Sequence, residues 1–374
     1  MATASGTQVP DTATATDRLV SLDALRGFDM FWIIGGQEII KGLARVFPGT
    51  VSTTITGQLE HVEWEGLHFY DVIWPLFMFM VGVSLAFSLA RRQSARVGKR
   101  SLYVHAITRA VILFALGMIA QGNLLEFNRS TFRPCYSVLH GIAAGYLIAF
   151  VVALNLRPKW QAAVTGAFLV VYWVLLLTIP VPGAGRGVLT PAGNAAAYID
   201  HLVLGSLSYG LNTWFLSYLG FASSVLLGVL AGGMLHSARS PRSKCALLGA
   251  YGSGLLLLGW VWSGWFPIIK LLWTSSYVLV AGGLSCITMA LFYLLADVLG
   301  YKRTMFGFVV IGMNPLAVYM ATMLFDFRKI GNIFVGHLLP RVGPWSGTLE
   351  ATTAFVVVWL ILYWMYRTKQ FVRL

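Results

Sequence analysis

Charged side chains are scarce in this chain of 374 residues. Asp, Glu, Lys and Arg make up 11% of the sequence, whereas 57% of it is hydrophobic. The apolar residues come in runs of about twenty, which is the length of helix that crosses the hydrocarbon core of a bilayer. This pattern, with a mean hydropathy of +0.73, excludes two soluble domains and predicts a polytopic membrane protein.

Cysteine is also rare. Cys135, Cys245 and Cys286 lie far apart in the sequence, and no two of them have the spacing of a metal-ligand pair. The sequence therefore predicts neither a disulfide framework nor a metal site.

Acidic residues are few relative to basic ones, with 14 Asp and Glu against 27 Lys and Arg and a net charge of +13. In a soluble protein this excess would suggest nucleic acid. In a membrane protein, basic residues gather in cytoplasmic loops, where they orient the helices and contact anionic lipids. We therefore expect membrane lipids, and no nucleic acid, among the partners.

The apolar runs predict an all-α helical bundle with about ten transmembrane helices, because lipid-exposed backbone must satisfy its own hydrogen bonds. An eleventh or re-entrant helix is an option in residues 327–345. The expected spans cover residues 23–46, 68–90, 102–121, 136–156, 159–179, 215–236, 245–263, 273–299, 304–326 and 350–367.

The basic residues also predict the orientation of the chain. With a cytoplasmic N-terminus, 17 of them fall on the cytoplasmic side and 9 on the other side, so both termini are expected in the cytoplasm. Residues 1–17 are small and polar and lack the features of a signal peptide, which predicts a disordered cytoplasmic tail before one transmembrane domain, 18–374. The loop 47–67 then lies on the outer face.

Several polar residues stand inside or beside the expected spans, where an ionisable group is expensive and often functional. Asp23, Arg26 and Asp29 recur every three residues in the first span, where Asp23 and Arg26 form a structural ion pair or Arg26 faces an anionic ligand. Asp71 lies one turn before Pro75, which is expected to kink the second span and let the acid point inward.

Further polar groups stand near other span ends. Asn314-Pro315 predicts a similar break in the span 304–326. The stretch "KLLWTSSYVL" (270–279) sets polar residues at an outer helix end. His61 differs from the other histidines because three glutamates lie within four residues of it, and a carboxylate can orient an imidazole as a general base.

Six stretches follow one another along the chain: "RLVSLDALRGFDM" (18–30), "HVEWEGLHFYDVIWPLFMFMVGVSL" (61–85), "PAGNAAAYID" (191–200), "SSVLLGVLAGGML" (223–235), "KLLWTSSYVL" and "GMNPLAVY" (312–319). In this order they resemble the heparan-α-glucosaminide N-acetyltransferase-like family of transmembrane acyltransferases, over residues 18–367. The first stretch alone also resembles the broader acyltransferase-3 group, so the ordered set carries the resemblance.

The resemblance implies transfer of acetyl from cytoplasmic acetyl-CoA to the amine of a glucosamine on the luminal or periplasmic side. It also implies that the active-site histidine precedes a Trp-x-Gly-Leu segment, which makes it His61 here. The topology argued from basic residues puts His61 on the same acceptor side. Gln37 stands where relatives carry an asparagine that helps to place the acetyl group.

One stretch departs from the family. In "SVLHGIAAGY" (137–146), His140 and Gly141 stand where many relatives have a Gln-Arg pair. A direct carry-over of a CoA-phosphate contact to this position is therefore not expected.

The expected chemistry is attack of an amine on a thioester, which needs a proton acceptor and donors to the oxyanion. His61, oriented by Asp71 or a loop glutamate, is the expected base, and Gln37 and Asn314 are the expected amide donors. A covalent route, in which His61 itself carries the acetyl group to the sugar, uses the same residues. The sequence leaves both routes open.

Basic residues on the cytoplasmic side are candidates for the CoA phosphates, although orientation signals and lipid contacts explain them equally well. These are Arg26, Arg91, Arg92, Lys302 and Arg303. Outer aromatic and polar residues are candidates for the acceptor pocket. These are Trp64, Lys270, Trp273, Ser276 and Asp200.

Two other classes remain open: an acyltransferase for another surface glycan, and a sugar or anion transporter. The outer loops and the start of the chain favour a bacterial inner membrane. Glycine-rich faces such as 228–233 allow a homodimer, and equally allow helix packing within one chain.

Overall fold

The computed structural model describes residues 19–208 and 210–372, in which the chain is built from helices and loops with two isolated β-bridges. This confirms the expected all-α class. The apolar runs are helical because lipid offers no hydrogen-bond partner to the backbone, so each helix satisfies its own amides. The tail expected at residues 1–17 lies outside the described residues.

Eight of the ten expected spans are confirmed as helical segments long and apolar enough to cross a membrane. They are α4 with a preceding 3₁₀ turn (Phe69–Ser94), α5 (Lys99–Ala120), α6 (Val138–Asn155), α7 (Pro158–Thr178), α9 (Tyr218–His236), α10 (Pro241–Ser263), α11 with a final π-turn (Ser275–Val298) and α15 with a preceding turn (Gly343–Arg367). The protein is thus an integral membrane protein by the length and composition of its helices.

The ninth expected span is broken where the sequence predicts. Helix α12 (Phe306–Gly312) and helix α13 (Pro315–Leu324) meet at an angle of 73° on either side of Asn314. Pro315 is the first residue of α13, where a missing backbone N–H costs no helical hydrogen bond. By length and composition the two helices form either one broken span or a re-entrant loop.

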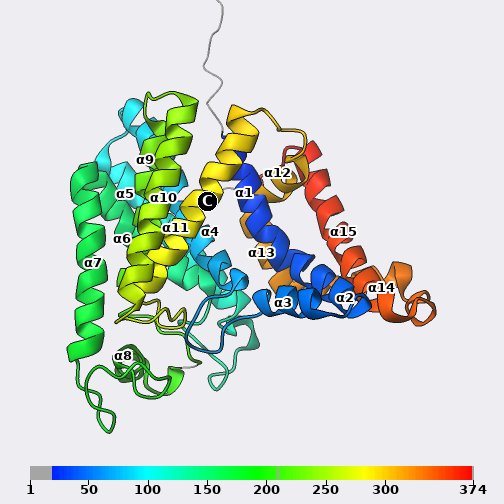
Figure 1. Ribbon diagram of the computed structural model, residues 1–374, viewed down its shortest axis with the longest axis horizontal. Helices are drawn as coiled ribbons and strands as arrows, with labels where there is room; N and C mark the ends of the chain where they lie inside the picture. The colour runs from blue at the N-terminus through cyan, green and yellow to red at the C-terminus, as the bar shows by residue number, and fades with distance from the viewer. Residues whose placement is uncertain (1–18, 209, 373–374) are drawn as a thin grey trace, which may run out of the picture.

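The expected first span, 23–46, is wrong as a continuous helix. Helix α1 (Val20–Phe31) passes through a π-turn (Trp32–Gly36) into helix α2 (Gln37–Val46), and Gly35 in the turn has a φ of 156°. Figure 1 shows α2 and helix α3 (Thr50–Gln58) lying across the end of α1. The physical reason is that α2 carries Glu38, Lys41 and Arg45, which are costly in hydrocarbon.

The regions outside the bundle also contain short helices. The long loop 180–214 holds helix α8 (Ala195–Leu204), and residues 327–345 hold helix α14 (Phe327–Val335). Helix α14 has nine residues, too few to cross a bilayer as the eleventh span would require. Figure 1 places α8, α2, α3 and α14 at the same end of the bundle, the lower end in that view.

Glycines let the helices nearest the centre approach closely. A Cβ atom on Gly228 of α9 would lie 2.0 Å from the Phe79 carbonyl oxygen of α4, and one on Gly82 of α4 would lie 1.9 Å from the Val225 carbonyl oxygen of α9. The glycine-rich face of α9 therefore packs within this chain at Gly228. The same close approach joins α1 and α12, where a Cβ on Gly27 would meet the Phe308 carbonyl oxygen at 1.7 Å.

We expect Gly228→Ala to destabilise the protein, because the added methyl group must push α4 and α9 apart, at a cost of about 1–3 kcal/mol. Gly233→Ala is the matched control on the same helix, because its Cβ has no neighbour within 4 Å. The control should be neutral or slightly stabilising. Thermal unfolding of the detergent-solubilised variants measures both, and equal midpoints would refute this close packing.

Candidate active site

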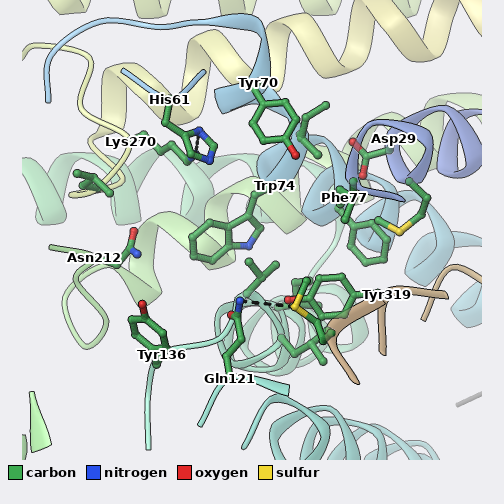
Figure 2. Close-up of a pocket in the computed structure, with 18 of the residues that line it drawn as sticks. Asp29, His61, Tyr70, Trp74, Phe77, Gln121, Tyr136, Asn212, Lys270 and Tyr319 are labelled. Carbon is green, nitrogen blue, oxygen red and sulfur yellow. Dashed lines mark hydrogen bonds between the residues drawn. The ribbon is translucent and has the colours of Figure 1, made fainter. Parts of the chain in front are cut away.

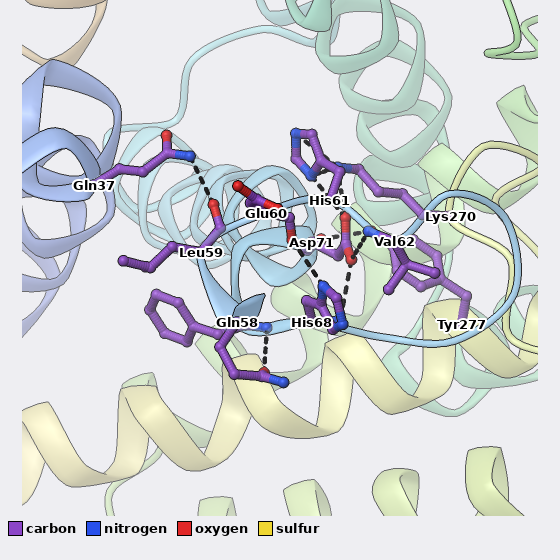
Figure 3. Close-up of polar contacts among 11 residues, drawn as sticks. Gln37, Gln58, Leu59, Glu60, His61, Val62, His68, Asp71, Lys270 and Tyr277 are labelled. Carbon is purple, nitrogen blue, oxygen red and sulfur yellow. Dashed lines mark hydrogen bonds and ion pairs between the residues drawn. The ribbon is translucent and has the colours of Figure 1, made fainter. Parts of the chain in front are cut away.

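The loop between α3 and α4 is the segment that carries His61, and several hydrogen bonds fix its shape. The Gln37 side-chain amide donates to the Leu59 carbonyl at 2.6 Å, and the His68 ring contacts the Glu60 carbonyl at 3.0 Å. Lys41 on α2 also forms an ion pair with Glu60 at 3.4 Å. Figure 3 shows the contacts of Gln37 with Leu59 and of His68 with Glu60. The backbone of His61 is therefore held from α2 and from the start of α4.

The His61 ring is paired with a buried carboxylate. Nδ1 of His61 lies 2.8 Å from Oδ1 of Asp71, whose side chain is 1% exposed. An ionised carboxylate has no proton to give, so a hydrogen bond between these two atoms requires the proton to be on His61 Nδ1, which leaves the lone pair on Nε2. This is the tautomer that a general base or a nucleophile requires.

Asp71 is held by donors from three parts of the chain. In addition to His61, its carboxylate accepts hydrogen bonds from the backbone N–H of His68 at 3.0 Å and of Val62 at 3.3 Å. Lys270 Nζ lies 3.0 Å from Oδ1, and the Tyr277 hydroxyl donates to the Asp71 carbonyl at 2.8 Å. This set of donors keeps the carboxylate ionised and fixed in position.

Lys270 reaches the site because two distant loops pair through their backbones. Glu65 and Ile269 form an isolated antiparallel bridge, and the Gly66 N–H donates to the Ile268 carbonyl at 2.9 Å. Lys270 Nζ consequently lies 2.8 Å from His61 Nδ1 and 3.4 Å from Nε2. Burial lowers the pKa of the Lys270 amine, and the neighbouring Asp71 opposes that shift.

A cavity of about 460 Å³ opens beside His61. This volume is in the range of small-molecule sites. Figure 2 shows His61 and Lys270 on one side of the cavity and Asp29 on the opposite side, with Tyr70 and Trp74 between them. Its wall is mostly aromatic and aliphatic, and its polar members are Asp29, His61, Tyr70, Gln121, Tyr136, Asn212, Lys270 and Tyr319.

Of the residues expected to bind the acceptor, Lys270 lines this cavity and four others do not. Trp64 donates its indole N–H to the Leu189 carbonyl, and Trp273 donates to the Ser224 hydroxyl. Ser276 donates to the Pro267 carbonyl, and Asp200 accepts from the backbone of Trp214 and Phe215. These side chains hold loops together, with Trp273, Ser276 and Asp200 at 2% exposure or less.

The two amides expected to contact the acetyl group also lie outside the cavity wall. Gln37 binds the Leu59 carbonyl and so positions the chain just before His61. Asn314 is fully buried, donates to the Gln370 carbonyl at 3.1 Å and accepts from the Val372 N–H at 2.9 Å. Asn314 therefore fastens the segment after α15 to the break between α12 and α13.

The basic residues expected to bind CoA have separate surroundings. Arg26 on α1 pairs with Asp23 at 3.2 Å and also donates to the Ser84 hydroxyl. Arg92 contacts the His105 ring at 2.9 Å, and its neighbour Arg91 is exposed in the last turn of α4. Lys302 and Arg303 are exposed in the turn before α12. None of the five lines the described cavity.

Most polar residues of the cavity wall were not predicted as site residues. Asp29 was recognised as an acid within an expected span, which was the available signal. Gln121, Tyr136 and Asn212 stand in loops or at helix ends whose folding the sequence did not reveal. His140, in contrast, is structural: its Nδ1 accepts from the N–H groups of Tyr136 and Ser137, and its Nε2 contacts the Phe114 carbonyl.

The described residues contain no group of three His, Cys, Asp or Glu side chains that could hold a metal ion. What the site does provide is an imidazole in contact with a fixed carboxylate and with Lys270, at the edge of a cavity for a small ligand. This arrangement suits proton transfer or acyl transfer at His61.

Comparisons with known proteins point in the same direction. No family model matches the chain. Heparan-alpha-glucosaminide N-acetyltransferase of Homo sapiens is 25% identical over 329 residues, which cover 71% of this chain and 49% of the human protein. The enzyme of Mus musculus is 25% identical over 325 residues, which cover 70% and 48%. This chain therefore spans about half the length of the curated relatives it matches, and the matches support a distant family relationship with the heparan-alpha-glucosaminide N-acetyltransferases.

Proposed function

We propose that this protein is a membrane acetyltransferase that moves acetyl from acetyl-CoA to the amine of glucosamine or a glucosaminide. The observation that carries the proposal is the His61–Asp71 pair, 2.8 Å between Nδ1 and Oδ1, at the edge of the cavity. The distant relatives, which are named as acetyltransferases of a glucosaminide, support the choice of reaction and of acceptor.

In this proposal Asp71 accepts the Nδ1 proton of His61, and His61 acts through Nε2. When the acceptor amine attacks the thioester carbonyl, the C–S bond breaks and CoA leaves as its thiolate. The neutral imidazole takes the proton that the nitrogen loses and can pass it on to the thiolate. The imidazolium that forms is stabilised by Asp71, which already accepts the Nδ1 proton. The same Nε2 is the atom that would bear the acetyl group in the covalent route, so this geometry serves either order of events.

The donor and acceptor are proposed to enter from opposite sides. Arg26, Arg91, Arg92, Lys302 and Arg303 are the proposed contacts for the CoA phosphates, because guanidinium and ammonium groups bind phosphate. Acetyl-CoA would supply the acetyl group from this side, which the basic loops suggest is cytoplasmic. The acceptor would enter at His61, and a bacterial inner membrane is the proposed location.

Replacing His61 tests the proposal directly. We expect His61→Ala to lower acetyl transfer by about 10²- to 10⁴-fold, because the proton acceptor is lost. The assay uses purified protein in sealed vesicles, with labelled acetyl-CoA on one side and glucosamine on the other. His201→Ala is the matched control, since His201 is an exposed histidine of α8 that does not line the cavity.

Two results would contradict the proposal. One is acetyl transfer by His61→Ala at the wild-type rate. The other is wild-type protein that exchanges glucosamine across the vesicle membrane without acetyl-CoA and yields no acetylated product, which would make it a transporter.

The pH dependence of transfer should report on Lys270. Its pKa is lowered, so as pH rises it loses its proton, and with it the ion pair to Asp71, earlier than an ordinary lysine does. We expect the rate to fall on the alkaline side for this reason. In Lys270→Arg the guanidinium stays charged, so that decline should move to higher pH, even if the maximal rate is lower. Rate–pH profiles of the two proteins with the same acceptor make the comparison, and coincident alkaline declines would contradict this role.

A further inference from the structure

Asp29 on α1 is a buried acid without a partner. Its side chain is 0% exposed, and neither carboxylate oxygen has a hydrogen-bond partner in the structure. Asp29 nevertheless belongs to the wall of the cavity that His61 lines. Figure 2 shows its carboxylate turned toward the side of Tyr70 and Phe77.

An isolated buried carboxylate lowers the stability of a protein, because it loses its hydration and gains no hydrogen bond in return. A structural acid is normally fixed by donors, as Asp71 and Asp200 are here. Asp29 has no such role in the fold, so its position calls for a ligand. Intramembrane ionisable groups that face a cavity commonly mark a substrate site.

The surroundings of Asp29 specify the chemistry of that ligand. Lys270, the lysine of the cavity wall, is already paired with Asp71 at 3.0 Å. Asp29 therefore needs hydrogen-bond donors from the ligand. The wall between Asp29 and His61 is formed by the aromatic rings of Tyr70 and Trp74. A carboxylate beside aromatic faces suits a ligand with an apolar face and several hydroxyl groups.

We propose that Asp29 binds the hydroxyl groups of the acceptor sugar, and thereby selects a hexosamine over a simple amine. This inference rests on the proposed function, because the reacting amine must lie at His61 and the rest of the sugar must then extend into the cavity. Asp29 and His61 stand on opposite sides of the cavity, so the hydroxyl groups of the same ring would approach Asp29. A carboxylate accepts from two hydroxyl donors at once.

Helix α1, which carries Asp29, is closely packed against α12. Helix α1 is in direct backbone contact with α12, since a Cβ on Gly312 would lie 1.8 Å from the Asp23 carbonyl oxygen. The carboxylate is closed to water without a ligand, so the sugar must move a neighbouring side chain to reach it. The hydroxyl groups of the sugar would then supply hydrogen bonds that the Asp29 carboxyl group lacks in the fold.

Asp29→Asn is the test variant, because asparagine keeps the shape and replaces one carboxyl oxygen with an amide group that only donates. Asp326→Asn is the matched control, since Asp326 is an acid at the start of α14 that does not line the cavity. The first measurement is calorimetric binding of glucose, which has the hydroxyl groups but no amine, to detergent-solubilised protein without acetyl-CoA. We expect Asp29→Asn to weaken this binding about tenfold, as for loss of a hydrogen bond to a charged group.

The second measurement compares glucosamine with analogues that each lack one hydroxyl group. In wild type, at least one analogue should show about a tenfold higher KM with little change in kcat, and in Asp29→Asn that difference should disappear. Cyclohexylamine, which has no hydroxyl groups, should respond little to Asp29→Asn. Thermal stability of Asp29→Asn should stay close to that of wild type, because both side chains have the same shape and Asp29 makes no hydrogen bond in the fold.

The inference is overturned if glucose binds Asp29→Asn as tightly as it binds wild type. It is also overturned if every deoxy analogue shows the same rise in KM in Asp29→Asn as in wild type. A third contradicting result is that cyclohexylamine depends on Asp29 as strongly as glucosamine does, because Asp29 would then bind the ammonium. The glucose arm needs no acetyl transfer, so it separates failure of this inference from failure of the proposed reaction.

Discussion

The rest of the site depends on the hydrogen bonds and the ion pair of the Asp71 carboxylate. It joins the His61 loop, the start of α4 and the loop that carries Lys270, three segments that are held together by hydrogen bonds to this one side chain and its carbonyl. Breaking a buried charge pair by removing one member typically costs about 3–5 kcal/mol, because the other charge is left uncompensated. The carboxylate that holds the loops also contacts the His61 ring, so the fold and the proposed chemistry share one requirement.

The cavity beside this carboxylate has polar groups at both ends and aromatic rings between them. At one end His61 and Lys270 are already paired with Asp71, and at the other end Asp29 has no partner. In the proposed mode of binding this asymmetry orients the ligand, with its reactive group at the imidazole and its hydroxyl groups at the acid on α1.

Much of the fold follows from the sequence because hydrocarbon leaves few options for the backbone. Apolar runs of about twenty residues identified eight helical segments, and Asn314-Pro315 identified the break between α12 and α13. The run 23–46 was wrongly predicted to be one helix because its apolar half and its charged half are continuous in sequence. Gly35 allows the chain to turn between the two halves. A hydropathy pattern does not contain that change of direction.

The candidate site was predictable only in part. The pairing of His61 with Asp71 agrees with the expected orienting carboxylate. Trp273 and Ser276 were expected to face the acceptor, but their directions depend on the turn after Lys270, in which Trp273 has a φ of 54°. Asp29 was visible as an acid in an apolar run, yet its lack of a partner is a property of the packed helices and not of the sequence.

The most direct test of this account is a double-mutant cycle between Asp71 and His61, with acetyl transfer from acetyl-CoA to glucosamine as the readout. If Asp71 acts by orienting and stabilising His61, Asp71→Asn should lower the rate in wild type and change it little in His61→Ala, so the two losses do not add. If Asp71→Asn instead lowers the rate by the same factor in wild type and in His61→Ala, Asp71 does not work through His61, and the account is contradicted.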